Sequence, residues 1–316
     1  MLRFIKNWTL PLAMLAGVIG YFCFSELDFL APTKPVVKVA VSFLTPFLIF
    51  SQLLLTFCKV EVKELTPRGW HGWLLLCQLV SAAVVAGVLY TCALDEAWRV
   101  ALEGMLVCLI CPTATAAAVV TGKLGGNAAA LTTYTLASNL LAAVFVPLVF
   151  PLVEPSTVEF MTAFLYLLGK VFPLLLFPFF LALLLRHFLP SVHRFLVGLK
   201  DMAFYLWAVA LTIVMAQTTR SVVEGDVAVS EEILIATLIL VVCVLQFAVG
   251  KWIGGRYQER ISGGQALGQK NTVLAIWMAY TYLNPASAIA PGSYVLWQNI
   301  INSYQLWKKR KNEMKY

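Results

Sequence analysis

The sequence predicts an all-α membrane protein with ten transmembrane helices, arranged as two inverted five-helix repeats. Three observations lead to this fold class. First, 60% of the 316 residues are hydrophobic and only 12% are charged, about half the charged share of a typical soluble domain. Second, ten apolar segments are long enough to cross a bilayer, for which about 20 residues suffice. Third, basic residues gather at alternate ends of these segments.

The ten predicted spans follow one another with short connections. A helix can cross a bilayer because it satisfies its own backbone hydrogen bonds, which an apolar medium cannot do. The spans cover residues 8–24, 35–58, 70–92, 97–122, 126–152, 159–186, 202–219, 230–251, 257–283 and 286–306. The fourth is interrupted at Cys111-Pro112-Thr113, and the ninth at Gly263-Gly264 and again at Gly268.

The basic residues predict the orientation, because cytoplasmic loops carry an excess of Lys and Arg. With both termini in the cytoplasm, 17 of the 23 Lys and Arg residues lie on the cytoplasmic side and four lie outside. The other two, Lys170 and Lys270, fall near the middle of their spans. We therefore expect a multi-pass protein of the cytoplasmic (inner) membrane with both ends inside.

Five spans lie in residues 1–152 and five in residues 153–316, so two repeats of odd span count would have opposite orientations. The two interrupted spans take equivalent places in these halves. Transporters build binding sites near mid-membrane from such broken helices. Pro112 or Gly268 alone could be a simple kink or a packing position, since both residue types are common in membrane helices. Matching breaks in matching places favour a binding site.

The residues at the breaks limit the chemistry of that site. The first break offers only two hydroxyls, from Thr113 and Thr115, before a run of alanines, which is a poor cage for a sodium ion by analogy with hard-cation sites. The second break places Gln269, Lys270, Asn271 and Thr272 at about membrane mid-depth. A lysine costs roughly 2.5 to 3.5 kcal/mol there, so Lys270 is expected to face a wet cavity or a partner.

Three environments are open to Lys270, because the spans hold no Asp or Glu at similar depth. It pairs with an anionic substrate, it is uncharged, or it is held by carbonyls and amides such as Gln78 and Asn139. Lys170 lies near Pro173 and Pro178, whose kinks could let its side chain snorkel or meet freed carbonyls.

Other functional classes find no support in the sequence. The net charge of +7 could suggest nucleic-acid binding, but the basic residues lie in short patches between apolar runs rather than on one solvated face. Seven cysteines in apolar segments imply no disulfide framework. Nothing has the spacing of a zinc site, and no serine has a neighbouring His and Asp. We expect no enzyme activity, no metal and no cofactor.

Several motifs, taken together, resemble the bile acid:sodium symporter family. Cys111-Pro112-x-x-Thr115, Gly126-Asn127-Ala128-Ala129-Ala130-Leu131 and Thr135-x-x-Ser138 are similar to its fourth and fifth spans. Gly268-x-x-Asn271-Thr272-x-Leu274-Ala275 is similar to the crossover motif of its ninth span, and Asn284-Pro285, Pro291-Gly292 and Trp297-x-Asn299-Ile300 are similar to its tenth. The layout matches over the whole chain, whereas specific motifs lie only in spans three to five and eight to ten.

The resemblance implies a panel domain of spans 1, 2, 6 and 7 and a core domain of spans 3–5 and 8–10. Spans four and nine would cross at their unwound middles. The substrate would be an organic anion such as a bile acid, pantoate or a similar carboxylate, bound in the crevice between the domains and carried by alternating access. Family members usually bind two sodium ions behind the crossover.

This chain departs from the family at the sodium ligands. The resemblance places Ala117 and Ala118 where the family has a Ser-Asn pair, Ala266 where it has an acidic ligand, and Lys270 where it has a glutamine. Two sodium ions beside one carboxylate carry a net charge of +1, and one ammonium beside an alanine does too. We therefore expect Lys270 to replace bound sodium, held by Gln78, Thr135 and backbone carbonyls, so that transport is sodium-independent.

The same lysine suggests a second coupling, to protons, because burial penalises the charged form of an amine. Lys270 could then release its proton in one conformation and regain it in the other. The site residues that we predict are Thr113, Thr115, Asn271 and Thr272 for the substrate, and Lys270, Gln78, Thr135 and Gln269 for the position of the sodium ions.

Two alternatives stay open. An arsenite or metalloid exporter of related fold could use Cys111 as a thiol ligand, although a single buried cysteine is usually inert. A non-transporting membrane sensor could keep a substrate pocket, although no long cytoplasmic loop supports signalling. A channel would need a continuous polar face, which the spans lack.

Overall fold

A computed structural model describes residues 2–61, 63, 65–154, 158–199, 202–225 and 227–313, with the side chains of residues 2–10, 28 and 31 outside the description. Within these residues there are thirteen α-helices and no strand, which confirms the predicted all-α class. Six helices are long and apolar enough to cross a membrane: α2 (Lys34–Cys58), α3 (Gly69–Thr91), α6 (Ala128–Val153), α7 (Phe160–Phe188), α9 (Met202–Glu224) and α10 (Val229–Gly255). The count of ten spans stays a prediction.

The other four predicted spans correspond to helices that are not among these six. The first corresponds to α1 (Leu2–Glu26), and the tenth to α13 (Ile289–Glu313) after a short 3₁₀ turn, η3 (Pro285–Ala288). The interrupted fourth span is α4 (Glu96–Ile110) followed by α5 (Ala117–Leu124), and the ninth is α11 (Arg260–Gly268) followed by α12 (Thr272–Tyr282). A short helix that the sequence analysis did not predict, α8 (Pro190–Gly198), lies in an expected loop.

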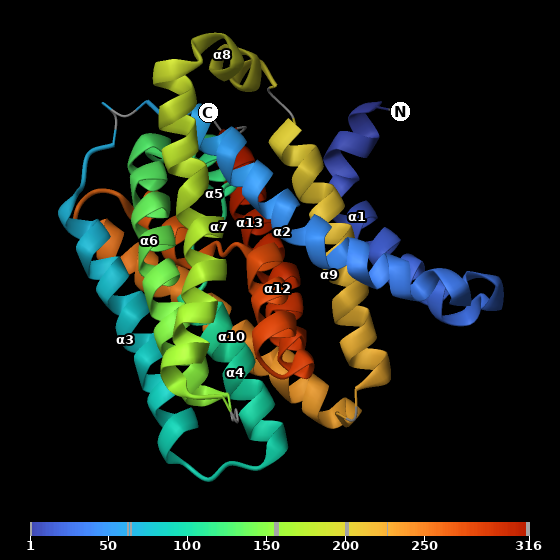
Figure 1. The fold of residues 1–316 in the computed structure, drawn as a ribbon. Coiled ribbons are helices and arrows are strands. Elements are labelled where there is room, and N and C mark those ends of the chain that lie inside the picture. The colour runs from blue at the N-terminus through green and yellow to red at the C-terminus, as the bar shows by residue number, and fades with distance from the viewer. Residues whose placement is uncertain are drawn as a thin grey trace. The chain divides into compact units, whose positions relative to one another are not determined.

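The chain divides into two compact units. Unit 1 comprises Met1–Lys59 and Pro173–Val227, so it contains α1, α2, α8, α9 and the second part of α7. In unit 1, α1 runs beside α9 (Figure 1). Gly17 makes this approach possible, because a Cβ atom there would lie 2.5 Å from the carbonyl oxygen of Thr212. Helix α2 also packs on α9.

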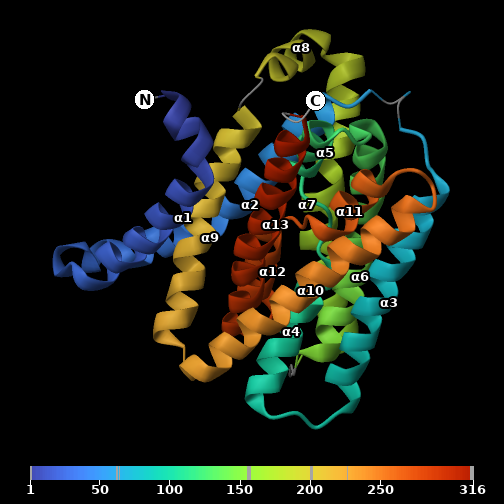
Figure 2. The ribbon, with the colours of Figure 1, turned by 180° about the vertical axis from the view of Figure 1, so that it is seen from behind.

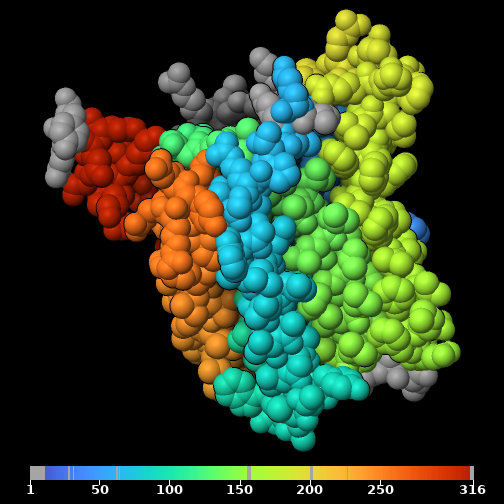
Figure 3. Space-filling view, turned by 90° about the vertical axis from the view of Figure 1, so that its left-hand side faces the viewer, coloured from blue at the N-terminus to red at the C-terminus, as the bar shows by residue number. Residues whose placement is uncertain are grey.

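Unit 2 comprises Val60–Phe172 and Ala228–Tyr316 and contains both interrupted spans. Its helix α3 lies between α10 and α6 on one face (Figure 3). Helices α10 and α11 pack against each other (Figure 2). A Cβ atom at Gly250 would lie 2.3 Å from the carbonyl oxygen of Gly263, and Gly254 also meets Gly263. Small residues at this spacing let membrane helices pack backbone against backbone.

Candidate functional site

The first break lies between α4 and α5. Helix α4 begins where the Asp95 side chain accepts a hydrogen bond from the Trp98 backbone amide at 2.9 Å, and it ends at Ile110. Pro112 explains the end, because a proline has no N–H to continue the helix and keeps the preceding residue out of helical conformation. Cys111 accordingly has an extended ψ of 134°.

The second break lies between α11 and α12. Helix α11 ends at Gly268, where a Cβ atom would lie 2.4 Å from the ring of Phe247 on α10. Helix α12 begins at Thr272, and the side-chain oxygen of Asn271 caps it by accepting from the Leu274 amide at 3.3 Å. Glycine is therefore required at 268 for packing, and Asn271 restarts the helix.

The two breaks lie against each other and pair through their backbones. Thr113 and Lys270 form an isolated antiparallel bridge. The Asn271 amide donates to the Pro112 carbonyl, and the Ala114 amide donates to the Gln269 carbonyl, both at 2.9 Å. Some of the backbone groups at each break are thus satisfied by the other break, as a membrane interior demands.

Lys270 is buried at this junction, with 1% of its surface exposed. Its ammonium donates to the carbonyl oxygen of Leu109 at 3.0 Å, and its backbone amide donates to the side chain of Gln298 at 2.9 Å. Leu109 is in the last turn of α4, where carbonyls lack helical partners and the helix dipole is negative. The ammonium therefore occupies the C-terminal end of a broken helix.

Gln78 on α3 binds the same end of α4. Its amide nitrogen donates to the carbonyl of Ile110 at 2.7 Å and to that of Cys111 at 3.3 Å. Its amide oxygen accepts from the hydroxyls of Tyr134 and Ser138 on α6, at 3.0 and 3.1 Å. Lys270 and Gln78 together satisfy three consecutive carbonyls, and both lone pairs of the Gln78 oxygen are used.

The expected hydrogen bonds of Lys270 to Gln78 and Thr135 do not form in this structure. Gln78 presents its donor to the α4 carbonyls and its oxygen to α6, so it has no acceptor left for an ammonium. The Thr135 hydroxyl donates to the Leu131 carbonyl of its own helix at 3.0 Å. The side-chain oxygen of Gln269 is buried and has no partner among the described residues. Of the expected partners, only a backbone carbonyl holds the lysine.

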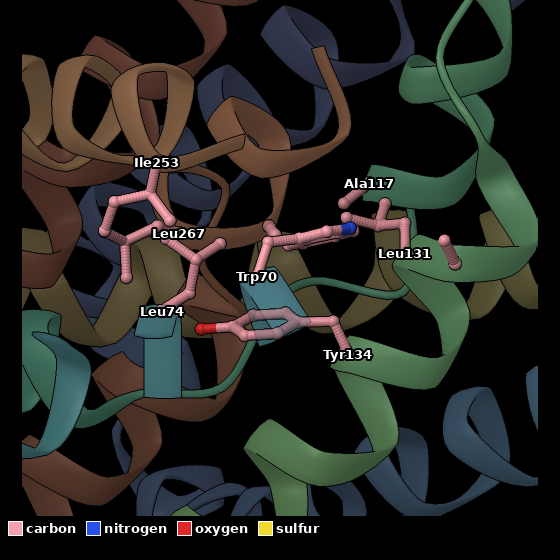
Figure 4. Close-up of a cluster of buried hydrophobic side chains, with 9 residues drawn as sticks. Trp70, Leu74, Ala117, Leu131, Tyr134, Ile253 and Leu267 are labelled. Atoms are coloured by element: carbon pink, nitrogen blue, oxygen red, sulfur yellow. The ribbon is translucent and has the colours of Figure 1, made fainter. Parts of the chain in front are cut away.

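Ala117 and Ala266, which the resemblance places at sodium-ligand positions, lie in a hydrophobic cluster (Figure 4). Both alanines are fully buried. The rings of Trp70 and Tyr134 stack in this cluster with centroids 6.1 Å apart. Figure 4 shows the Trp70 indole nitrogen directed toward Ala117, and this nitrogen has no acceptor among the described residues. The cluster thus presents ring surface, methyl groups and an N–H donor where a cation would need oxygen atoms.

The residues expected to bind substrate divide into two pairs. Thr115 and Asn271 are partly exposed, whereas Thr113 and Thr272 are buried. The Thr113 hydroxyl donates to the Ala266 carbonyl at 2.6 Å, which ties the first break to α11. Of these four residues, only Thr115 and Asn271 are accessible.

Three further residues hold the breaks and were not singled out from the sequence. The Tyr294 hydroxyl donates to the Gly268 carbonyl at 2.8 Å, Gln298 accepts from the Lys270 amide, and Tyr134 donates to Gln78. Each is a polar side chain within an apolar run, and such a side chain is costly in lipid unless it has a partner. That cost is the signal that could have identified them.

Comparison with known proteins identifies a family for this chain. The family model described as the SBF-like CPA transporter family matches residues 39–306. No curated protein matches the chain. The matched range contains both breaks and every residue of the candidate site.

Proposed function

The chain belongs to the SBF-like CPA transporter family, and from this premise we propose that it carries an organic anion across the cytoplasmic membrane by alternating access without sodium. The family is of the bile acid:sodium symporter type, so the resemblance found in the sequence is confirmed. Membership indicates a multi-pass membrane transporter. The substrate class, the coupling and the orientation with both ends in the cytoplasm are parts of the proposal.

The observation that carries the proposal is the environment of Ala117 and Ala266. A sodium ion needs several oxygen ligands by analogy with hard-cation sites. Here the two alanines pack with Trp70, whose unpaired N–H faces Ala117 and would repel a cation. Gln78 matches a ligand position in the family, but its side-chain oxygen already accepts hydrogen bonds from Tyr134 and Ser138. These residues favour a site that does not take up sodium.

Lys270 supplies the positive charge that the sodium ions supply in the family. Its ammonium binds the Leu109 carbonyl at the end of α4 and is inaccessible to water. This bond from the second break to the helix before the first holds the two breaks together. We infer that this is the structural task of sodium in the relatives, performed here by the protein itself.

The substrate is proposed to bind where α5 and α12 begin. The N-terminus of a helix favours negative charge, because its first N–H groups lack helical partners. Thr115 lies two residues before α5, and Asn271 directly precedes α12. Both side chains are partly exposed, so they can donate hydrogen bonds to a carboxylate, with the charge of Lys270 behind them. This combination favours an anion over a neutral or cationic substrate.

The ten-span architecture belongs to the same proposal. Helices α4–α5 and α11–α12 are the interrupted fourth and ninth spans of the two inverted repeats, residues 1–152 and 153–316. Spans 1, 2, 6 and 7 would form the panel domain and the remaining spans the core domain. The membership of unit 2 agrees with part of this division, since all four helices of the interrupted spans fall in it, whereas α7, the expected sixth span, is divided between the two units.

Uptake into proteoliposomes tests the proposal. The purified protein is first screened by thermal shift against carboxylates and bile acids, taurocholate and pantoate among them, with sodium or choline as the only cation. Uptake of the stabilising compound is then measured under the same two conditions. We expect equal rates within about twofold. A steep sodium requirement would overturn sodium independence, and ligand binding without any flux would favour the sensor.

The metalloid exporter gains no support from the surroundings of Cys111. Its thiol donates to the Asn271 carbonyl at 3.0 Å and is buried. The described part of the chain holds no group of three His, Cys, Asp or Glu side chains placed to bind one ion. Loss of arsenite resistance in Cys111→Ala, with unchanged carboxylate binding, would reverse this preference.

A further inference from the structure

A basic groove lies at the end of unit 2 where α10 ends and α11 begins. It has a volume of about 500 Å³. We define the groove by its lining residues: Leu124, Lys251, Arg260, Ile261, Gln305, Lys308, Lys309, Asn312 and Glu313. They come from α5, α10, α11 and the last turns of α13, which lie near one another in Figure 2.

The groove carries more positive charge than its own carboxylate can balance. Four of the lining residues are cationic, and Glu313 is the only acidic one. Glu313 is paired with Lys309 at 3.4 Å, and the Lys309 ammonium also donates to the Lys123 carbonyl at 2.9 Å. Lys251, Arg260 and Lys308 have no acceptor among the described residues. Three cations thus face one cavity without a partner of the protein's own.

A second observation points to a ligand with several acceptor atoms. The side-chain nitrogen of Gln305, which lines the groove, is buried and has no acceptor in the described chain. Lys251 is held in place, because its aliphatic stem lies against Gly264 of α11, where a Cβ atom would be 2.5 Å from its Cγ. A buried donor beside positioned cations matches an oxyanion, and a phosphate group offers both the charge and the oxygens.

Tryptophans next to groove residues in the sequence favour a position at the membrane surface. Trp252 on α10 and Trp307 on α13 are both exposed, at 59% and 50%. The Arg256 guanidinium lies 4.0 Å from the Trp252 ring, and the Lys311 ammonium 5.1 Å from the Trp307 ring. Exposed tryptophans gather at the level of lipid headgroups, and basic pockets between membrane helices bind anionic headgroups.

We propose that the basic groove binds a phosphate group, supplied by the headgroup of an anionic phospholipid. Arg260 and Lys308 contact the phosphate, and Gln305 donates a hydrogen bond to it. The lipid would join the end of α13 to α11, the helix that leads into the second break. The proposal needs only that the chain is embedded in a membrane, and no transport step enters its test.

Thermal unfolding of the full-length protein in delipidated detergent micelles tests it. Phosphatidylglycerol is titrated against phosphatidylcholine with the same acyl chains, and glycerol 1-phosphate is titrated as the soluble headgroup. The variant Arg260→Gln/Lys308→Gln removes two groove charges from exposed side chains. The control Arg310→Gln/Lys311→Gln removes two charges from the end of α13 that do not line the groove.

We expect phosphatidylglycerol, and not phosphatidylcholine, to raise the melting temperature of the wild-type protein. The groove variant should need about thirtyfold more phosphatidylglycerol for half the shift, and the control should stay within about twofold. Equal loss in both variants would mean diffuse attraction and overturn the site. Equal protection by glycerol 1-phosphate would assign the groove to a soluble phosphate and overturn the lipid. A wild-type protein that ignores all three compounds would overturn the proposal altogether.

Discussion

The ammonium of Lys270 and the carbonyl of Leu109 are joined by a 3.0 Å hydrogen bond across the two broken helices. Because Lys270 is buried, this bond replaces hydration that the ammonium would have in water. The bond thus couples the second break to the end of α4, and removing the amine should weaken this junction.

A pH gradient should drive uptake by the wild-type protein and not by Lys270→Met. A neutral amine still donates to Leu109, so the lysine can lose its proton without releasing α4. The measurement is proteoliposome uptake of the ligand found by thermal shift, with and without an inward proton gradient.

The matched control is Lys170→Met, the other mid-span lysine. Lys170 is exposed on α7, and its ammonium lies 5.7 Å from the Tyr166 ring. This variant should keep the wild-type response to the gradient. If Lys270→Met keeps that response too, the lysine is a fixed tether, and uniport or anion exchange describes the transport better.

The positions of the two breaks could be predicted from the sequence, whereas the partners of the buried polar groups could not. Pro112 and Gly268 impose local limits on the backbone, and those limits act within a few residues of the chain. The bonds of Gln78 connect helices that are far apart in the sequence, with α6 more than 50 residues away. Which of its two amide atoms meets which helix depends on packing.

Thr113 illustrates the same limit at the substrate site. The sequence places it near Thr115 at the first break and predicts that both hydroxyls contact the substrate. The bridge with Lys270 turns Thr113 inward to the Ala266 carbonyl, so one of two neighbouring threonines is structural. The packing of Trp70 and Tyr134 in the cluster could not be predicted from the sequence either. The contact between an aromatic residue on α3 and an alanine on α5 depends on how the helices pack.

Gln78→Leu should lower stability strongly, by about 2 to 4 kcal/mol. The substitution leaves two α4 carbonyls and the hydroxyls of Tyr134 and Ser138 without their partner in a buried site. Orphaned buried groups cost roughly 1 to 3 kcal/mol each, and relaxation recovers part of that. Thermal unfolding in detergent measures the change.

Gln246→Leu provides the control, because Gln246 is also a buried glutamine of unit 2 and neither of its side-chain atoms has a partner among the described residues. Its replacement by leucine should leave the melting temperature unchanged or raise it. Equal losses in the two variants would show that the bonds of Gln78 do not hold the break.

Glu103→Leu should destabilise the protein, and Glu103→Gln should be tolerated. Glu103 on α4 is fully buried, and one carboxyl oxygen accepts from the Ser287 hydroxyl at 2.7 Å and from the Asn284 amide at 3.3 Å. Glutamine keeps an acceptor oxygen there, whereas leucine leaves two donors unpaired at a cost of about 2 kcal/mol or more. Ser287→Ala, which removes one donor, should lie in between. Comparable melting temperatures for all three variants would contradict this order.

Glu154 should contribute a loss of stability as the pH rises from about 5 to 8. Glu154 follows the end of α6, where burial and the neighbouring Glu103 raise its pKa to about 7 although Arg99 opposes the shift. A carboxyl whose pKa is higher in the folded state stabilises the fold while it is protonated. This contribution is complete below the pKa of the unfolded chain and disappears as the pH rises through about 7.

Glu154→Gln removes this titration, so between about pH 5 and 8 its melting temperature should fall less, or rise more, than that of the wild-type protein. The exposed Glu159→Gln is the control and should keep the wild-type slope. Melting curves at half-unit steps from pH 5 to 8, in one buffer series of constant ionic strength, compare the three proteins. If the slopes of Glu154→Gln and the wild-type protein are equal, Glu154 has the same pKa in the folded and unfolded chains. Its carboxyl at the end of α6 would then be hydrated in the folded protein.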